Sequence, residues 1–288
     1  MGTQFGLWLL QALGKLPLSW LRAIGAGLGR VLFYVIPSRR HVVLTNLRLC
    51  FPDWNEAKRQ SVARESFIYF AQAWLDRGWL WHASESVLRQ RLKMSGNLDC
   101  LVHRQPTVLF VPHFVGLDAC SVAVILNYQL PMTAIVTAQT NKVIDRWVRH
   151  GRMRLGHATL LEQEAGIKPI VACLRRGEYL HLSPDMSFGL AQSLFVPFYG
   201  QTTATVPSLS RIAKLGRARV VPMTSCLTPE GYDIVLHPEW ENYPTEDAQA
   251  DTALMNQRLE GLINDMPAQY FWVHKRFKTR PPGSPSVY

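Results

Sequence analysis

His113 and Asp118 are the two residues of this sequence whose types and spacing best suit a chemical reaction. They lie in the stretch Val108-Leu-Phe-Val-Pro-His-Phe-Val-Gly-Leu-Asp118, and further apolar residues follow as far as Leu126. A carboxylate that accepts a hydrogen bond from one imidazole nitrogen orients the other nitrogen as an acceptor and makes it more basic. We therefore predict that His113 is a general base and that Asp118 is its partner.

A base of this kind could remove the proton of a substrate hydroxyl while that hydroxyl attacks a carbonyl carbon. The sequence has no Gly-x-Ser-x-Gly motif and no cysteine beside His113 that could serve as a nucleophile. Direct transfer to the hydroxyl is therefore favoured over a covalent acyl-enzyme. A histidine followed by an acid at this spacing also arises by chance, so the pair alone predicts only a proton transfer.

Four further residues are candidates for substrate binding. Arg149 and Arg152 belong to the basic segment 141–154, which suits a phosphate, although arginines on a helix often only face solvent. Asp185 and Gly189 follow a predicted strand and would lie at a sheet edge, where the alternative role for Asp185 is to cap a turn. The segment 195–205 combines aromatic and hydroxyl side chains, so it could line a channel for a chain-like apolar substrate or pack in the core.

The elements that position these residues alternate between strands and helices. Residues 107–111 are predicted to be a strand that ends at Pro112-His113, and residues 118–126 a helix. The same reasoning gives strands at 133–137, 179–182, 219–224 and 232–236, and helices at 56–80, 141–154, 167–176, 205–215 and 251–266. This alternation predicts an α/β fold, a single domain with a central mixed sheet flanked by helices. His113 then stands at the end of a strand, where open α/β sheets bind their ligands.

Residues 5–36 are strongly apolar. On a helical projection, Lys15, Arg22 and Arg30 gather in one sector and leave a broad apolar face. That face consists of Trp20, Leu21, Ile24, Leu28, Leu32 and Val35. We predict a helix in the membrane interface whose basic side chains reach anionic head groups, with residues 1–40 as the anchor and 41–288 as the α/β domain. A spanning helix and a core helix with solvated arginines are the alternatives.

The chain is basic, with 31 Lys and Arg residues against 21 Asp and Glu residues and a formal net charge of +10. Cations gather before the first acid, Asp53, and after the last one, Asp265. Since no nucleic-acid-binding motif is present, we expect the partners to be a membrane surface and an anionic membrane lipid rather than nucleic acid. The five cysteines are far apart and no metal-ligand cluster occurs, so we expect free thiols, no metal and no cofactor.

An ordered set of motifs resembles the bacterial lipid A biosynthesis acyltransferases, the late lauroyl and myristoyl transferases of the wider glycerolipid and lysophospholipid acyltransferase superfamily. The resemblance covers most of the chain. It consists of Asn46 with Cys50-Phe51-Pro52, the His113-x4-Asp118 box, Gly151-Arg152, Arg176-Gly177, Pro184-Asp185, Phe195-Val-Pro-Phe-Tyr-Gly200 and the tail Tyr270-Phe-Trp-Val-His-Lys-Arg-Phe-Lys-Thr-Arg280. The complete set is much more specific than the box alone.

The resemblance implies a glycerol-3-phosphate acyltransferase-like α/β fold and an O-acyltransferase at the cytoplasmic face of the bacterial inner membrane. The donor would be a fatty acyl thioester of acyl carrier protein or of coenzyme A, and the acceptor a hydroxyl of a lipid A precursor. His113 would be the base, Asp118 its partner, and Arg152 and Asp185 further site residues. The alternatives are a lysophospholipid acyltransferase that uses acyl-CoA and a membrane-surface binding protein without activity.

Two positions depart from the family pattern. Many relatives have Glu at the acid position, preceded by Asn-Trp, where this chain has Gly116-Leu117-Asp118. Relatives often carry a second acid after the position of Asp185, where this chain has Ser187. Both departures concern the acceptor side of the site, so the resemblance defines the acceptor less well than the donor.

Overall fold

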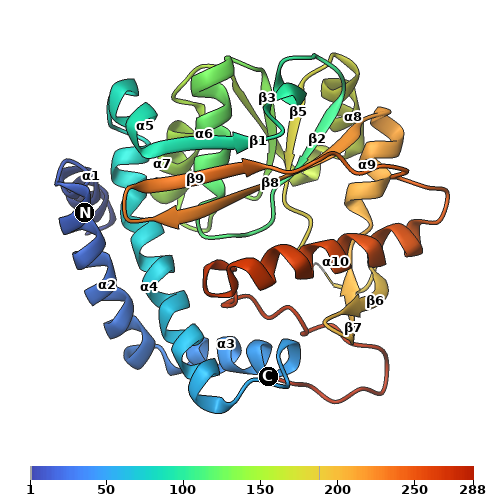
Figure 1. The fold of residues 1–288 in the computed structure, drawn as a ribbon, viewed down its shortest axis with the longest axis horizontal. Helices are drawn as coiled ribbons and strands as arrows, with labels where there is room; N and C mark the ends of the chain where they lie inside the picture. The colour runs from blue at the N-terminus through green and yellow to red at the C-terminus, as the bar shows by residue number, and fades with distance from the viewer. Residues whose placement is uncertain (1, 188) are drawn as a thin grey trace.

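A seven-stranded mixed sheet lies at the centre of the molecule (Figure 1) in a computed structural model that describes residues 2–187 and 189–288. The strand order is β1-β9-β8-β2-β5-β3-β4. The strands are β1 (Leu92–Gly96), β2 (Thr107–Phe110), β3 (Met132–Val136), β4 (Ala158–Glu162), β5 (Tyr179–Leu182), β8 (Arg219–Thr228) and β9 (Gly231–Leu236). Neighbouring strands are parallel except for β8 and β9, which are antiparallel. β1 and β9 therefore run against the other strands.

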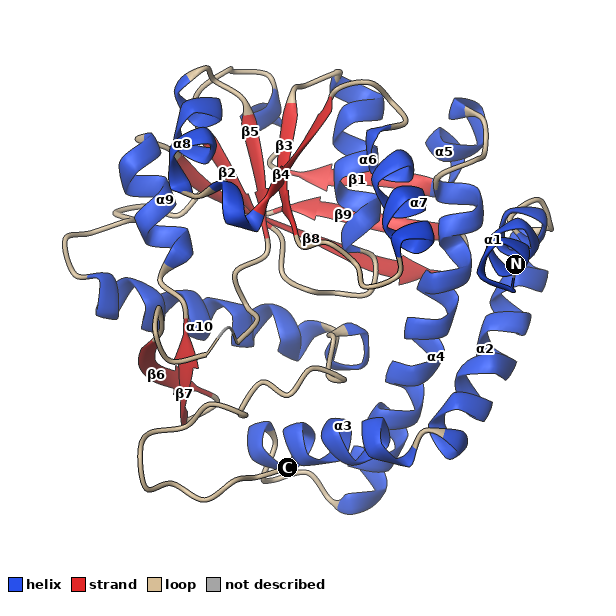
Figure 2. Ribbon diagram, turned by 180° about the vertical axis from the view of Figure 1, so that it is seen from behind, coloured by secondary structure: helices blue, strands red, loops and turns tan. Residues whose placement is uncertain are grey.

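Helices cover both faces of this sheet (Figure 2). One face carries α5 (Glu85–Arg91), α6 (Leu117–Tyr128) and α7 (Lys142–Met153), and the other carries α8 (Ile167–Arg175), α9 (Ser208–Gly216) and α10 (Ala248–Asp265). A separate antiparallel hairpin of β6 (Leu194–Phe198) and β7 (Gln201–Thr205) packs against α10. The core therefore forms two apolar layers, one on each side of the sheet.

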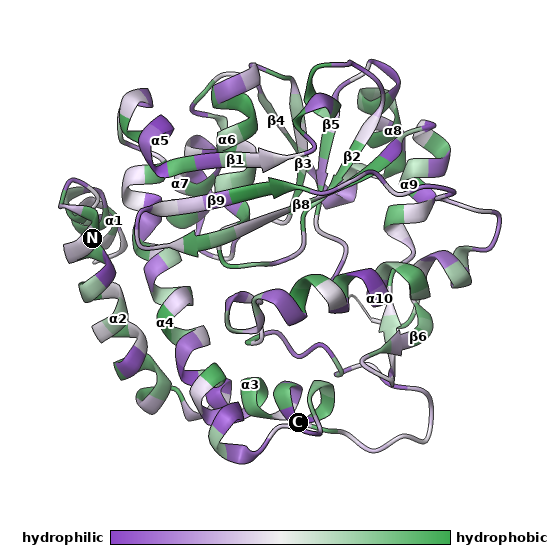
Figure 3. Cartoon of the chain, in the orientation of Figure 1, coloured by the Kyte–Doolittle hydropathy of each residue, from purple (hydrophilic) through white to green (hydrophobic). Residues whose placement is uncertain are grey.

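The central strands form because their residues are apolar on both faces. All four residues of β2 and all four of β5 are buried, and hydrophobic residues run along β8 and β9 (Figure 3). A parallel strand covered by helices on both sides has this continuous apolar character rather than an alternating one. β2 and β5 lie side by side in the middle of the sheet, with Phe110 paired to Leu182.

The N-terminal helices pack along the 25-residue helix α4 (Glu56–Leu80). They are α1 (Gly2–Leu13), α2 (Leu18–Val35) and α3 (Pro37–Cys50). α2 approaches α4 closely because glycines stand at the contact. A Cβ on Gly25 would lie 2.7 Å from Cγ of Gln72, and a Cβ on Gly29 would lie 2.4 Å from Cα of Ile68. These glycines of the N-terminal segment therefore serve helix packing.

Two cations that the sequence assigned to anionic partners are buried instead. Arg22 donates to both oxygens of Asp76 at 2.7 Å and to two backbone carbonyls at the ends of β8 and β9. Arg276 donates to the side chain of Thr205 and to a backbone carbonyl beside it. A buried carboxylate needs a cation, and Arg22 is the one that faces Asp76. The prediction that Arg22 reaches head groups is therefore wrong, whereas Lys15 and Arg30 are exposed.

Much of the predicted apolar face of α2 is open to solvent. Trp20 is 65% exposed, whereas Leu21 is fully buried because it belongs to the core layer under α4. The other large exposed apolar residues of this region are Ile24, Leu28, Val31, Tyr34 and Val35 on α2 and Phe5, Trp8 and Leu9 on α1. Among the described helices, none is by itself long and apolar enough to cross a membrane. α2 and α3 together meet that test but are bent by 92° at their junction.

The predicted α/β fold is confirmed, and most predicted elements lie within a few residues of the observed ones. The sequence pattern did not predict the strands β1, β4, β6 and β7, and β8 extends four residues beyond the expected end at 224. Thr205 ends β7, and the predicted helix begins only after Pro207. All five cysteines are free. The division at residue 40 falls inside α3 and stays a prediction.

Candidate active site

His113 and Asp185 occupy equivalent positions beyond the ends of two neighbouring parallel strands. β2 and β5 are paired through Phe110 and Leu182, and each is followed by two residues, the second a proline, before the His or the Asp. Nδ1 of His113 lies 2.7 Å from Oδ1 of Asp185, and the backbone N–H of His113 donates to Oδ2 at 3.0 Å. Both oxygens of Asp185 bind His113, and the Asp185 side chain is fully buried, so it holds the imidazole in one orientation.

The prediction that Asp118 binds the His113 ring is wrong for this structure. Asp118 lies in the first turn of α6 and binds two arginines: Oδ2 accepts from Arg77 at 2.9 Å and Oδ1 from Arg152 at 2.8 Å. No hydrogen bond joins Asp118 to His113 in the part of the chain that the structure describes. The start of α6 turns the carboxylate toward α4 and α7, whose half-buried guanidinium groups require a counter-charge. Asp185 takes the expected place beside the imidazole.

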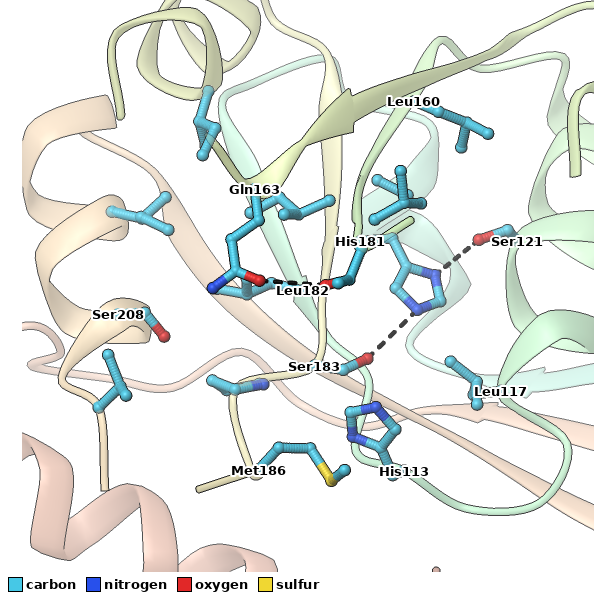
Figure 4. Close-up of a pocket in the computed structure, with 18 of the residues that line it drawn as sticks. His113, Leu117, Ser121, Leu160, Gln163, His181, Leu182, Ser183, Met186 and Ser208 are labelled. Carbon is cyan, nitrogen blue, oxygen red and sulfur yellow. Dashed lines mark hydrogen bonds between the residues drawn. The ribbon is translucent and has the colours of Figure 1, made fainter. Parts of the chain in front are cut away.

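His113, Asp118 and Arg152 line a cavity of about 710 Å³ beside the carboxyl ends of the parallel strands. Figure 4 shows His113 at this cavity together with other lining residues. Small-molecule sites occupy roughly 300–1,000 Å³, so a lipid chain fits this space by size. Apolar side chains form most of the wall; they include Leu117, Val122, Met132, Ala134, Leu160, Ile167, Ile170 and Ile212. The cavity can therefore hold a long apolar group that ends beside His113.

The family model of the bacterial lipid A biosynthesis acyltransferases matches residues 1–279. This chain belongs to that family. The lipid A biosynthesis palmitoleoyltransferase of Escherichia coli K12 is 31% identical, over 99% of this chain and 94% of that protein. The lauroyltransferase of the same organism is 28% identical over the same shares. Among solved structures, a 1-acyl-sn-glycerophosphate acyltransferase from Thermotoga maritima matches with a TM-score of 0.40 and 12% identity, over 84% of this chain and 97% of that chain.

Two predicted substrate-binding residues of this acyltransferase lie outside the cavity wall. Arg149 forms ion pairs with Asp145 at 2.7 Å and with Glu162 at 2.6 Å. Gly189 lies in the loop between β5 and β6, with a φ of 94° that favours glycine. Residues 195–205 do not line the cavity either: they form the β6–β7 hairpin, whose aromatic residue Phe198 is buried in the core. Of the two roles considered for that segment, packing in the core is therefore the one found.

Arg152 reaches the cavity because the residue before it is a glycine. A Cβ on Gly151 would come within 2.2 Å of Cδ2 of Trp81, so a larger residue would push α7 away. Gly116 has a similar role before α6, where a Cβ would lie 2.5 Å from the ring of Tyr232. Both glycines thus act through packing: Gly116 stands directly before α6, which carries Asp118, and Gly151 lies within α7 directly before Arg152.

Burial and nearby charges set the protonation of the site. Burial lowers the pKa of His113, but the charge of Asp185 and the hydrogen bond to it outweigh this and raise the pKa overall. Burial raises the pKa of Asp185, but the charge of His113 and the hydrogen bond to it lower this pKa to about 2. For Asp118, burial raises the pKa, but Arg152 and Arg77 hold it well below its usual range. Both carboxyls are therefore ionised at neutral pH, and His113 is more basic than an ordinary histidine.

The C-terminal segment completes the site, a role that the sequence motifs did not reveal. The Tyr270 hydroxyl donates to Oδ2 of Asp185 at 3.0 Å, and the Phe271 N–H donates to the backbone carbonyl of His113 at 3.0 Å. Asn46 fixes this segment by donating to two of its backbone carbonyls. Several motif residues therefore share one task, which is to hold the His113–Asp185 pair.

Proposed function

We propose that this enzyme moves a fatty acyl chain from an acyl thioester to a hydroxyl of a lipid A precursor, with His113 as the general base. The observation that carries the proposal is the bond from His113 Nδ1 to Asp185 in a largely apolar cavity. No described residue forms a hydrogen bond with Nε2 of His113, whose side chain is 24% exposed. That nitrogen is available to the acceptor hydroxyl.

One base suffices for the reaction. The acceptor hydroxyl gives its proton to Nε2, its oxygen bonds to the thioester carbon, and the carbon–sulfur bond then breaks. The departing thiolate takes the proton back from the imidazolium, so His113 is regenerated. Asp185 stabilises the imidazolium between these steps and fixes the neutral tautomer before them. A thiolate is a good leaving group, so no covalent intermediate on the enzyme is required.

Arg152 supplies a positive charge in the cavity, and Asp118 acts as a positioning residue for it. Arg77 occupies the second oxygen of Asp118, so two arginines share one carboxylate and leave an excess positive charge. A guanidinium in this place suits a phosphate of the donor or acceptor, or the carbonyl oxygen as it gains negative charge. This arrangement supports an anionic lipid as the acceptor.

The proposal includes acyl carrier protein as the donor and the cytoplasmic face of the bacterial inner membrane as the place of reaction. The exposed apolar residues of α1 and α2 support attachment to a lipid surface, since soluble monomers rarely expose a continuous apolar patch of this kind. The exposed cations Lys15 and Arg30 would meet anionic head groups.

Purified His113→Ala tests this function. We expect its rate of acyl transfer from acyl carrier protein or coenzyme A thioesters to a lipid A precursor to fall by about 10²–10⁴-fold, as is typical when a general base is lost. His103→Ala, which removes an exposed histidine outside the cavity, is the matched control and should retain the wild-type rate. Transfer by His113→Ala at the rate of the control would refute the proposal, and transfer only to a glycerolipid would refute the acceptor.

A further inference from the structure

Three polar side chains line the cavity on the side of α6, and the mechanism above uses none of them. They are Ser121 on α6, His181 on β5 and Ser183 just beyond β5 (Figure 4). The same cavity wall contains the apolar residues Leu117, Val122, Met132 and Leu160 as well as the charged residues Asp118 and Arg152. A polar cluster in such a wall needs a polar partner from a bound ligand or from its own members.

The cluster satisfies only part of its own hydrogen-bonding capacity. Oγ of Ser121 lies 2.6 Å from Nδ1 of His181, which is a good hydrogen bond. Ser183 donates its proton to the carbonyl oxygen of Val111 at 2.5 Å. The contact from Ser183 Oγ to Nε2 of His181 is 3.5 Å long, at the limit of a hydrogen bond. Nε2 is thus the atom of the cluster that lacks a good partner.

A hydroxyl group is the ligand that fits this atom in either tautomer. If Ser121 donates to Nδ1, then Nε2 carries the proton and needs an acceptor. If Nδ1 donates to Ser121, then Nε2 needs a donor. A hydroxyl can do both. An anion fits poorly, because burial and the charge of Arg152 lower the pKa of His181 to about 3 and keep the ring neutral.

The position of the cluster relates it to the reacting end of the chain. His181 is paired with Leu109 of β2 and Ala134 of β3, inside the sheet edge at which the reaction takes place. Ser183 stands two residues before Asp185, which holds the base. We therefore expect a group bound by His181 to lie near the thioester carbonyl of a chain whose reacting end is at His113. It differs from the acceptor hydroxyl, which must reach His113.

We propose that Ser121, His181 and Ser183 bind a hydroxyl near the carbonyl of the transferred chain, so that the preferred donors are 2- or 3-hydroxyacyl thioesters. This rests on the proposed function, because it assumes that the chain in this cavity is the donor's. An unsubstituted chain would bury Nε2 without giving it a partner, and sites built to bind a hydroxyl discriminate strongly against analogues that lack it.

A competition assay with the full-length enzyme tests the inference. Dodecanoyl, 2-hydroxydodecanoyl and 3-hydroxydodecanoyl thioesters are supplied together in equal amounts, and mass spectrometry of the products gives the ratios of kcat/KM. We expect wild type to favour one hydroxylated chain by on the order of tenfold or more. His181→Leu and Ser183→Ala should bring that ratio close to one, while Ser208→Ala, which removes a hydroxyl from the cavity wall on the α9 side, should keep it.

Ser183→Ala is the smaller change and preserves the test if His181→Leu does not fold. Equal use of all three chains by wild type would overturn the inference while leaving the proposed function intact. A preference that persists in both variants would overturn it as well. Absence of product from every donor would refute the proposed function, and with it this inference.

Discussion

The imidazole of His113 is held through Nδ1 and through the backbone of the residue itself, and both bonds end on Asp185. The hydroxyl of Tyr270 binds the same carboxylate. Asp118, only five residues from His113, is instead saturated by Arg77 and Arg152. The two carboxylates therefore have different partners, an imidazole for Asp185 and two guanidinium groups for Asp118, and single substitutions should separate their effects.

The rate of transfer should depend on the protonation of His113. A general base acts in its neutral form, and the pKa of His113 is raised above the ordinary value of 6.5. We therefore expect kcat to rise with pH through a midpoint above 6.5 and to level off beyond it. A profile of kcat between pH 5 and 9 measures this. A midpoint at or below 6.5 would contradict the pairing with an ionised Asp185.

Asp185→Asn should lower kcat strongly, although the two side chains have nearly the same size. The amide would donate to Nδ1, which forces the proton onto Nε2 and removes the acceptor, so kcat should fall by on the order of 10⁴-fold. Asp118→Asn is the matched control, because it alters the arginine cluster and leaves Nδ1 with its partner. In this variant the pH midpoint of kcat should stay close to the wild-type value, whereas KM should change. A shifted pH midpoint with an unchanged KM would instead support Asp118 as the partner of His113.

At the scale of elements, α2 has two faces with separate functions. Gly25 and Gly29 let its inner face press against α4. Its outer face exposes Trp20, Ile24 and Leu28, each at least 40% exposed. Deleting all of α1 and α2 would leave Asp76 without Arg22, so a loss of membrane binding could not be told apart from a loss of folding. Substitutions on the outer face alone are therefore the clearer test of the membrane prediction.

The triple variant Trp20→Gln, Ile24→Gln, Leu28→Gln should bind anionic phospholipid vesicles at least about tenfold more weakly than wild type, because each lost apolar side chain removes on the order of 1 kcal/mol of transfer free energy. Sedimentation with vesicles measures the partition. A control triple, Val102→Gln, Met153→Gln, Leu215→Gln, removes exposed apolar residues from other parts of the surface. Equal loss of binding in both triples would show that α2 is not the membrane contact.

At the scale of the whole molecule, the buried carboxylate of Asp76 connects the N-terminal helices to the sheet. It accepts hydrogen bonds from Arg22 on α2, from Trp79 on α4 and from Tyr232 on β9. The ring of Tyr232 in turn touches the position where a Cβ of Gly116 would lie, just before α6. This cluster thus fixes the helical layer relative to the loop that carries His113.

Asp76→Ala should lower the free energy of unfolding by about 3–5 kcal/mol, since it leaves the Arg22 guanidinium buried without a counter-charge. Urea unfolding in a mild detergent measures the loss. Glu65→Ala on the exposed side of α4 is the control and should stay within about 0.5 kcal/mol of wild type. Combining Asp76→Ala with Arg22→Met should recover much of the lost stability. If Asp76→Ala matches the control, the cluster does not hold the layers together.

Hydrophobic patterns along the chain predicted most of this fold, because a buried strand or an amphipathic helix records its surroundings in its own residues. β4 escaped prediction since its residues are only partly buried at the edge of the sheet. Ser121 and His181 escaped as site residues because neither belongs to a motif, and only the contact of α6 with β5 brings them together. The sequence did contain a signal that Asp185 lies beside His113: Val111-Pro-His113 and Ser183-Pro-Asp185 follow two apolar strands in the same way.

By itself the sequence determined the fold class and the family and predicted His113 as the base, because these depend on residue types and on local periodicity. The tertiary structure decided which carboxylate binds the His113 imidazole. Asp118 is close to His113 in sequence but begins a helix that turns it toward two arginines. Asp185 is 72 residues away in sequence, yet the parallel pairing of β2 with β5 sets it beside the ring. Strand order and register arise from packing across the whole chain, and no local spacing encodes them.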